Sequence, residues 1–324
     1  MTNKIIIIAG DPNSINSEII FKAWKKISPK IKKKIIIIAN YNLFATQANR
    51  LNFKLRLKKV KNINEKLNTH FLNILDYKLK FKNCFNVSKR LASNYVMGCI
   101  NLAHTLSSQK KIKGFINCPI DKKLINKNNR VYGVTELLAK KSKIAKSSEV
   151  MLLFNKKLSV SPITTHLKVK EISKKIKKKV IISKIKTLIK FYKVNFNKIP
   201  KIAILGLNPH NGEYLKETEE IKEIIPAINA LKKIKKININ GPKSADSFFI
   251  NEFKKFDLVV GMYHDQVLIP FKNLFKFNAI NITLGLKYLR ISPDHGTAKD
   301  KIGKNAGNPE SIIQCIKFLN SFNN

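Results

Sequence analysis

The chain has 324 residues, 44% of them hydrophobic, so it can bury one large core or two medium-sized ones. Its formal net charge is +43 at pH 7, but lysines occur along nearly the whole chain without clustering, which favours a solvated surface over a dedicated nucleic-acid surface. The four cysteines form no CxxC pair and no apolar run reaches the roughly 18 residues of a membrane helix, so we expect a cytoplasmic protein without a disulfide framework or a membrane span.

Short apolar runs alternate with amphipathic segments from the N-terminus onwards. Buried strands are predicted at 4–10, 33–40, 114–119, 149–155, 201–208, 256–262 and 277–285. Helical patterns occur at 15–27, 88–110, 168–192, 217–233 and 244–255. This alternation favours an α/β architecture with a largely parallel core sheet, in which ligands bind beyond the carboxyl ends of the strands.

Three histidines stand where predicted strands end. His166 closes "LSVSPITTH", His210 follows the strand in "KIAILGLNPH", and His264 follows "FDLVVGMYH". One such histidine would more often be structural. Three in equivalent places favour a divalent-metal site, because neutral imidazoles bind Zn²⁺ or similar ions and three protein ligands leave a position open for substrate.

Basic and polar groups follow in the next thirty residues. Lys272, Asn281 and Arg290 surround a predicted strand, and a Lys–Arg pair near a metal suits a phosphate or carboxylate. Lys272 could equally be part of the lysine-rich background, whereas arginine is rare in this chain. Gly296 and Gly303 lie in a run that could cradle a nucleotide, although it is not a GxGxxG fingerprint.

Several long motifs together carry a resemblance to a known family. They include "GLNPHNGE" at 206–213, "GPKSADSFF" at 241–249, "MYHDQVLIPFK" at 262–272 and "RISPDHGTA" at 290–298. In this order along the chain, they resemble the 4-hydroxythreonine-4-phosphate dehydrogenases of pyridoxal phosphate biosynthesis. The resemblance implies NAD-dependent, metal-assisted oxidation and decarboxylation of 4-phosphooxy-L-threonine to 3-amino-2-oxopropyl phosphate.

The resemblance also implies a fold and an assembly. The family is similar to the isocitrate and isopropylmalate dehydrogenases, which have two α/β/α domains and an interdomain active-site cleft. We expect residues 1–135 with 286–324 to form the first domain and residues 136–285 to form the second. A homodimer is implied whose active site is shared between subunits, with His166 and His210 from one chain and His264 from its partner.

Carried over by motif, the family's functional residues fall on specific positions of this chain. The metal ligands are His166, His210 and His264, for Zn, Mg or Co; the substrate contacts are Thr135, Lys272, Asn281 and Arg290; and NAD binds near His295, Gly296 and Thr297 without a Rossmann fingerprint. Asp246 and Asp265 are our candidates for orienting the ligands or transferring a proton.

The chain departs from the family pattern at three places. The first loop has Asn13, Ser14, Asn16 and Ser17 in a usually glycine-rich stretch. Val134 replaces a substrate-contacting histidine, and Asp121 replaces an asparagine. These changes leave open a related enzyme for another phosphorylated hydroxy acid, or a drifted homologue with little turnover. A non-enzymatic polyanion-binding protein is the alternative from a different class.

Overall fold

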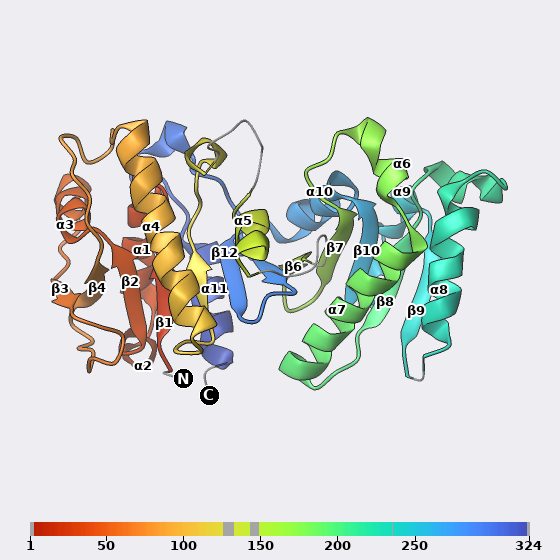
Figure 1. Cartoon of the computed structure of the whole chain (residues 1–324), viewed down its shortest axis with the longest axis horizontal. Coiled ribbons are helices and arrows are strands. Elements are labelled where there is room, and N and C mark those ends of the chain that lie inside the picture. The colour runs from red at the N-terminus through yellow and green to blue at the C-terminus, as the bar shows by residue number, and fades with distance from the viewer. Residues whose placement is uncertain (1–2, 126–132, 143–148, 235, 323–324) are drawn as a thin grey trace. The chain divides into compact units, whose positions relative to one another are not determined.

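The computed structural model describes residues 3–125, 133–142, 149–234 and 236–322, which divide into two compact units (Figure 1). Unit 1 comprises Met1–Ser142 and Leu286–Asn324, and unit 2 comprises Lys143–Gly285. The division falls after α5 (Val134–Lys141), and Leu138 of this helix is fully buried in the core of unit 1.

Unit 1 contains six strands joined by parallel pairing. Their spatial order is β3 (Leu57–Val60), β4 (Leu72–Asp76), β2 (Ile35–Ala39), β1 (Ile5–Ile8), β5 (Gly114–Asn117) and β12 (Leu289–Pro293). The helices are α1 (Asn16–Lys26), α2 (Pro29–Lys32), α3 (Tyr41–Arg50), α4 (Lys89–Ser108), α5 and α11 (Glu310–Ser321). β1 is four consecutive isoleucines with both faces buried, as a central parallel strand requires.

The alternation of side chains along β1 explains the layers of unit 1. Ile6 and Ile8 pack in the same core cluster as Val96 of α4. Ile7 points to the opposite face, where it lines a small internal space with Ile20 of α1 and Ile312 of α11. Figure 1 shows α4 crossing one face of the sheet, and the result is an α/β/α sandwich.

Unit 2 has a mixed sheet. Its strand order is β11 (Ile280–Leu284), β6 (Val150–Phe154), β7 (Ser159–Thr164), β10 (Leu258–Tyr263), β8 (Lys201–Leu205) and β9 (Asn238–Lys243). β6 runs antiparallel to both of its neighbours, and the other pairings are parallel. A tight turn joins β6 to β7, closed by a 3.0 Å hydrogen bond from Asn155 N to Leu158 O, and so short a connection permits only an antiparallel pair.

The helices of unit 2 differ from those that the sequence pattern predicts, and the helix at His264–Phe275 was not predicted. They are α6 (Ile172–Lys175), α7 (Lys178–Phe196), α8 (Ile225–Lys232), α9 (Ala245–Phe248) and α10 (His264–Phe275), with a π-helical turn at Glu220–Ile224. The predicted helix 168–192 is interrupted at Ile176, which is extended and fully buried. The predicted helix 244–255 is reduced to α9 and a 3-10 turn.

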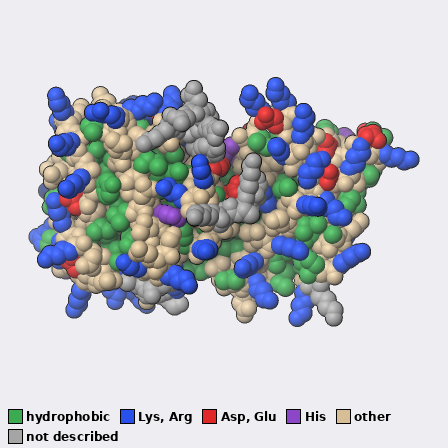
Figure 2. Space-filling model, in the orientation of Figure 1, with side chains coloured by type: hydrophobic (Ala, Val, Ile, Leu, Met, Phe, Trp, Pro, Cys, Tyr) green, Lys and Arg blue, Asp and Glu red, His purple; other side chains and the backbone are tan. Residues whose placement is uncertain are grey.

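The surface agrees with the dispersed charge of the sequence. Figure 2 shows Lys and Arg side chains scattered over the visible face of each unit rather than gathered in one patch. None of the helices in the described part of the chain combines the length and the apolar character that crossing a membrane requires.

A close backbone approach in unit 1 generates the first prediction. A Cβ added to Gly114 would lie 2.1 Å from the carbonyl oxygen of Leu289 on the neighbouring strand β12. Gly114→Ala should therefore lower the free energy of unfolding by about 1–3 kcal/mol, the usual cost of forcing apart a packed core. Urea denaturation measures this difference.

Gly296→Ala is the matched control, because no heavy atom lies within 4 Å of the added Cβ. Equal stability of the Gly114→Ala and Gly296→Ala proteins would contradict this account of the β5–β12 pairing.

Candidate functional site

The three predicted metal histidines all belong to unit 2 and follow three neighbouring strands. His166 comes shortly after β7, His210 follows β8, and His264 is the first residue of α10, directly after β10. These strands are parallel and adjacent in the order β7, β10, β8, so their carboxyl ends lie at the same edge of the sheet (Figure 1). The placement that the sequence predicted for the histidines is thus present in one unit.

Within one chain the three histidines form two separate contacts. The rings of His166 and His264 have centroids 6.0 Å apart, and Nδ1 of His264 lies 2.6 Å from Oδ1 of Asp265. Nε2 of His210 lies 4.0 Å from Oδ2 of Asp246. Among the residues that the structure describes, no three His, Cys, Asp or Glu side chains of the chain are close enough together to hold a metal ion.

The donor set nevertheless suits a divalent ion. Imidazole nitrogens bind Zn²⁺ and Co²⁺, and both predicted aspartates already lie beside a histidine. A carboxylate that accepts a hydrogen bond from Nδ1–H of His264 leaves Nε2 with its lone pair available. These residue types therefore fit a divalent metal ion. Within one chain, His166 and His264 lie close together, and His210 lies apart from them.

Side-chain hydrogen bonds tie the three strand ends together. The hydroxyl of Thr164, at the end of β7, donates to the carbonyl of Met262 in β10 over 2.7 Å. Gln266 accepts from Met262 N and donates to the carbonyl of Gly206 after β8, both over 2.7 Å. The histidine that follows each strand is thus attached to a cross-linked frame.

The loop that carries His210 has an unusual backbone. Residues 210–214 all have positive φ, including 48° at His210 and 60° at Asn211, a conformation that costs non-glycine residues free energy. Glu220 stabilises its start: this fully buried carboxylate accepts from Leu207 N at 2.6 Å and from Asn208 N at 2.8 Å. The presentation of His210 therefore depends on a residue that the sequence analysis did not identify.

The sequence does contain a signal for Glu220. It stands four residues before Ile224, and the buried stripe continues at Ala227, Ile228 and Leu231. An acidic residue on the buried stripe of an amphipathic segment must find hydrogen-bond donors, and here the donors come from the loop after β8.

The predicted substrate contacts are divided between the units. Thr135 of α5 and Arg290 of β12 lie in unit 1, whereas Lys272 of α10 and Asn281 of β11 lie in unit 2. Arg290 is 6% exposed, and burial lowers the pKa of its guanidinium to about 10 while the carboxylate of Glu136 opposes the shift. Arg290 therefore remains a cation at neutral pH.

Asn281 has a polar atom available for a ligand. Its Oδ1 is buried and has no hydrogen-bond partner within the described part of the chain. A buried acceptor without a donor costs free energy, and such groups are found where a ligand supplies the missing bond. This observation supports the predicted role of Asn281.

The predicted nucleotide segment lies in unit 1 between β12 and α11. Thr297 accepts a hydrogen bond from Ile15 N through its carbonyl at 3.3 Å, and His295 Nδ1 lies 2.9 Å from the carbonyl of Gly296. An added Cβ at Gly296 or Gly303 would meet no heavy atom within 4 Å. The backbone is therefore open to a ligand at both glycines, which fits a dinucleotide.

The departures from the family pattern are accommodated locally. In the first loop, residues 10–18, only Gly10 has positive φ, so Asn13 and Ser14 occupy ordinary conformations. Asp121 forms an ion pair with Lys299 at 2.5 Å, and this contact lowers the pKa of Asp121 and raises that of Lys299. The extra negative charge is thus compensated within unit 1.

Val134 is the departure without a compensating polar contact in the described structure. It is the first residue of α5, half-buried, and packs against the core cluster around α4. An apolar side chain at this position contributes packing but no hydrogen bond to a ligand.

Comparison with known proteins gives matches over most of the chain. The family described as "Pyridoxal phosphate biosynthetic protein PdxA" matches residues 30–319. A 4-hydroxythreonine-4-phosphate dehydrogenase of Sulfurihydrogenibium sp. (strain YO3AOP1) is 37% identical over 322 residues, which are 97% of each protein. A D-threonate 4-phosphate dehydrogenase of Pectobacterium atrosepticum is 33% identical over 235 residues, 70% of each.

Solved structures also match nearly the whole chain. The 1.25 Å crystal structure of 4-hydroxythreonine-4-phosphate dehydrogenase from Klebsiella pneumoniae is similar with a TM-score of 0.84 and 28% identity, over 99% of both chains. Isocitrate dehydrogenase from Methylococcus capsulatus has a TM-score of 0.50 at 12% identity, over 98% of this chain and 84% of its own. The predicted α/β fold of the isocitrate dehydrogenase type is confirmed.

The role of Glu220 generates a prediction. Glu220→Ala removes the acceptor of two backbone N–H groups, and each buried donor left unsatisfied costs about 1–3 kcal/mol, so the free energy of unfolding should fall by at least that amount. Urea denaturation gives the difference.

Glu217→Ala is the control from the same segment, because the Glu217 side chain is 87% exposed and its ion pair with Lys222 lies at the surface. Two variants with equal loss of stability would contradict the assigned role of Glu220.

Proposed function

The chain belongs to the pyridoxal phosphate biosynthetic protein PdxA family, and from this membership we propose that it is a 4-hydroxythreonine-4-phosphate dehydrogenase. The proposed reaction is the NAD-dependent, divalent-metal-assisted oxidation and decarboxylation of 4-phosphooxy-L-threonine to 3-amino-2-oxopropyl phosphate. The observation that carries the proposal is the 37% identity, over 97% of both proteins, to a relative named for this activity.

The reaction has a simple balance. The secondary hydroxyl of the substrate loses a proton and its carbon loses a hydride, which together leave a ketone; NAD accepts the hydride and becomes NADH. The carboxylate β to the new ketone then leaves as CO₂, and the α-carbon of the resulting enolate takes up a proton to give the amino ketone. Asp246 and Asp265 are the candidate acceptors of the hydroxyl proton, since each lies beside a predicted metal-binding histidine.

His166, His210 and His264 would hold the divalent ion, in a site completed by a second subunit of a homodimer. The ion, when bound, supplies a positive charge that favours an alkoxide over an alcohol. The protein's own contribution is orientation: Asp265 holds the ring of His264 through Nδ1, and Gln266 fixes the strand end behind it.

The substrate's negative charges call for cations and hydrogen-bond donors. Arg290 is buried and protonated, so it suits bidentate binding of a phosphate or carboxylate. Lys272 would add a second charge, and Thr135 and Asn281 would add hydrogen bonds. His295, Gly296 and Thr297 would contact NAD, where the open backbone at Gly296 permits a close approach.

Val134 favours D-threonate 4-phosphate as a second candidate substrate. Val134 offers no hydrogen bond at a place where the family usually has a histidine, and a relative 33% identical over 70% of each chain is named a D-threonate 4-phosphate dehydrogenase. 4-Phosphooxy-L-threonine and D-threonate 4-phosphate are both phosphorylated hydroxy acids, so the same metal ion and the same basic side chains would bind either of them.

The metal assignment gives a direct prediction. His210→Ala removes one of three proposed ligands, and a site left with two rarely retains its ion, so NADH formation should be lost while the fold is kept. Absorbance at 340 nm gives the rate, circular dichroism reports the fold, and chelator-treated wild type should lose activity until a divalent ion is restored.

His70→Ala is the control, since His70 lies in unit 1 outside every predicted site. Full activity of a chelator-treated His210→Ala protein would rule out the metal assignment.

Val134 generates the next prediction. Val134→His should lower the KM for 4-phosphooxy-L-threonine, because a recovered charge-assisted hydrogen bond contributes about 1.5–3 kcal/mol. Val134→Leu, which changes size without adding a polar group, should leave the KM unchanged. Steady-state kinetics measures the KM of each variant. Equal KM values for the two variants would mean that the pocket is built around an apolar residue.

A further inference from the structure

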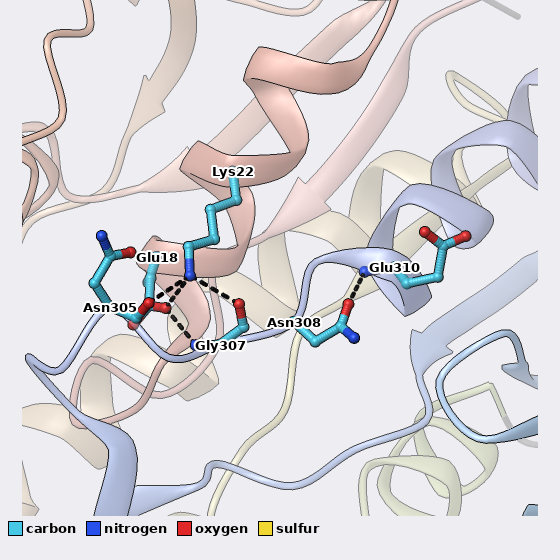
Figure 3. Close-up of polar contacts among 6 residues, drawn as sticks. All are labelled: Glu18, Lys22, Asn305, Gly307, Asn308 and Glu310. Carbon is cyan, nitrogen blue, oxygen red and sulfur yellow. Dashed lines mark hydrogen bonds and ion pairs between the residues drawn. The ribbon is translucent and has the colours of Figure 1, made fainter.

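The segment between β12 and α11 carries the three residues proposed to contact NAD, and its second half is attached to α1 (Figure 3). Glu18, on the first turn of α1, is 1% exposed. Its Oε1 accepts the N–H of Gly307 and a hydrogen bond from Nζ of Lys22 at 2.8 Å. A buried carboxylate thus holds the backbone of a distant loop and is neutralised by a lysine one helical turn later.

Lys22 completes the attachment. Its ammonium group donates to the carbonyl of Asn305 at 2.8 Å and to the carbonyl of Gly307 at 2.9 Å, in addition to Glu18. These three acceptors use all three protons of the ammonium group. The turn is therefore bound to α1 through one N–H group and two carbonyl groups, which leaves its backbone little freedom to rotate.

Glycine is needed at the centre of this contact. A Cβ on residue 307 would lie 2.9 Å from Oε1 of Glu18 and 3.0 Å from a methyl carbon of Ile19. Gly307 is buried, whereas the neighbouring Ala306 and Asn308 are exposed. The turn consequently has one side pressed against α1 and one side open.

The attachment sets the direction of two peptide N–H groups. In a trans peptide the C=O and N–H groups point to opposite sides. Because the carbonyls of Asn305 and Gly307 point to Lys22, the N–H groups of Ala306 and Asn308 point away from α1. Both N–H groups belong to exposed residues and point to the open side of the turn.

We propose that Glu18 and Lys22 are positioning residues for dinucleotide binding, which fix the turn at residues 303–308 so that the N–H groups of Ala306 and Asn308 face acceptor oxygens or nitrogens of NAD. This inference rests on the proposed function. The side chain of Asn308 supports the same geometry, because its Oδ1 accepts from Glu310 N at 2.9 Å and so joins the turn to the first turn of α11 (Figure 3).

The test compares Lys22→Met with Lys26→Met in the full-length protein. Both variants remove one lysine from α1, but Lys26 is exposed on the helix surface. Without its three hydrogen bonds, the turn of Lys22→Met should open more often, so backbone amides of residues 303–308 should exchange about tenfold faster in the ligand-free protein. Lys26→Met should exchange like wild type.

Binding and kinetics separate positioning from simple stability. In Lys22→Met the dissociation constant and the KM for NAD should rise about tenfold, equivalent to about 1.4 kcal/mol, while kcat at saturating NAD and the KM for the phosphorylated substrate change little. Lys22→Arg retains a charged donor and should recover most of the NAD affinity. If Lys22→Met does not fold, Gly307→Ala tests the same contact from the loop side.

The outcomes are distinct. Unchanged exchange at 303–308 in both Lys22→Met and Gly307→Ala would overturn the proposed attachment. Faster exchange with unchanged NAD affinity would overturn its role in nucleotide binding. A wild-type protein that binds no NAD by calorimetry would overturn the proposed function and the nucleotide role together, whereas the exchange data would still decide whether the attachment exists.

Discussion

A buried carboxylate needs hydrogen-bond donors, and in each unit this requirement fixes one loop that carries predicted site residues. Glu18 in unit 1 holds Gly307, and Glu220 in unit 2 holds Leu207 and Asn208. Both glutamates are almost fully buried and both stand at the start of a helical segment. The donors are backbone N–H groups, so the carboxylates determine the path of the loop and not merely the position of a side chain.

Strand pairing and neutral hydrogen bonds explain where the histidines lie. Parallel pairing of β7, β10 and β8 brings three strand ends to one edge, and Thr164 and Gln266 then link these ends to each other. Side chains that follow such tied ends move little relative to one another, which is what a metal site demands. The proposed chemistry therefore depends on a frame of neutral hydrogen bonds behind the histidines.

The sequence predicts the elements whose local pattern and final environment agree. The isoleucine runs at 4–10 and 33–40 became β1 and β2, because a strand buried on both faces needs no alternation. The pattern could not reveal the antiparallel hairpin of β6 and β7, which depends on a tight turn, or the break at Ile176, where burial outweighs helix propensity. The left-handed loop at His210 was also missed, since the contact that stabilises its start, between Leu207 N and Glu220, joins residues 13 positions apart in the chain.

The position of the three histidines after strands was predicted from the sequence, but the hydrogen bonds around them were not. No periodicity or motif spacing indicates that Gln266 bridges Met262 and Gly206, because such a bond depends on the register of two strands. The measurement that tests the central claim most directly is a side-by-side assay of 4-phosphooxy-L-threonine and D-threonate 4-phosphate, each labelled with ¹³C in the carboxyl group, with NAD and a divalent ion. We expect the higher kcat/KM for 4-phosphooxy-L-threonine, with one labelled CO₂ released for each NADH formed. A higher kcat/KM for D-threonate 4-phosphate, or NADH formed without CO₂, would contradict the proposed reaction.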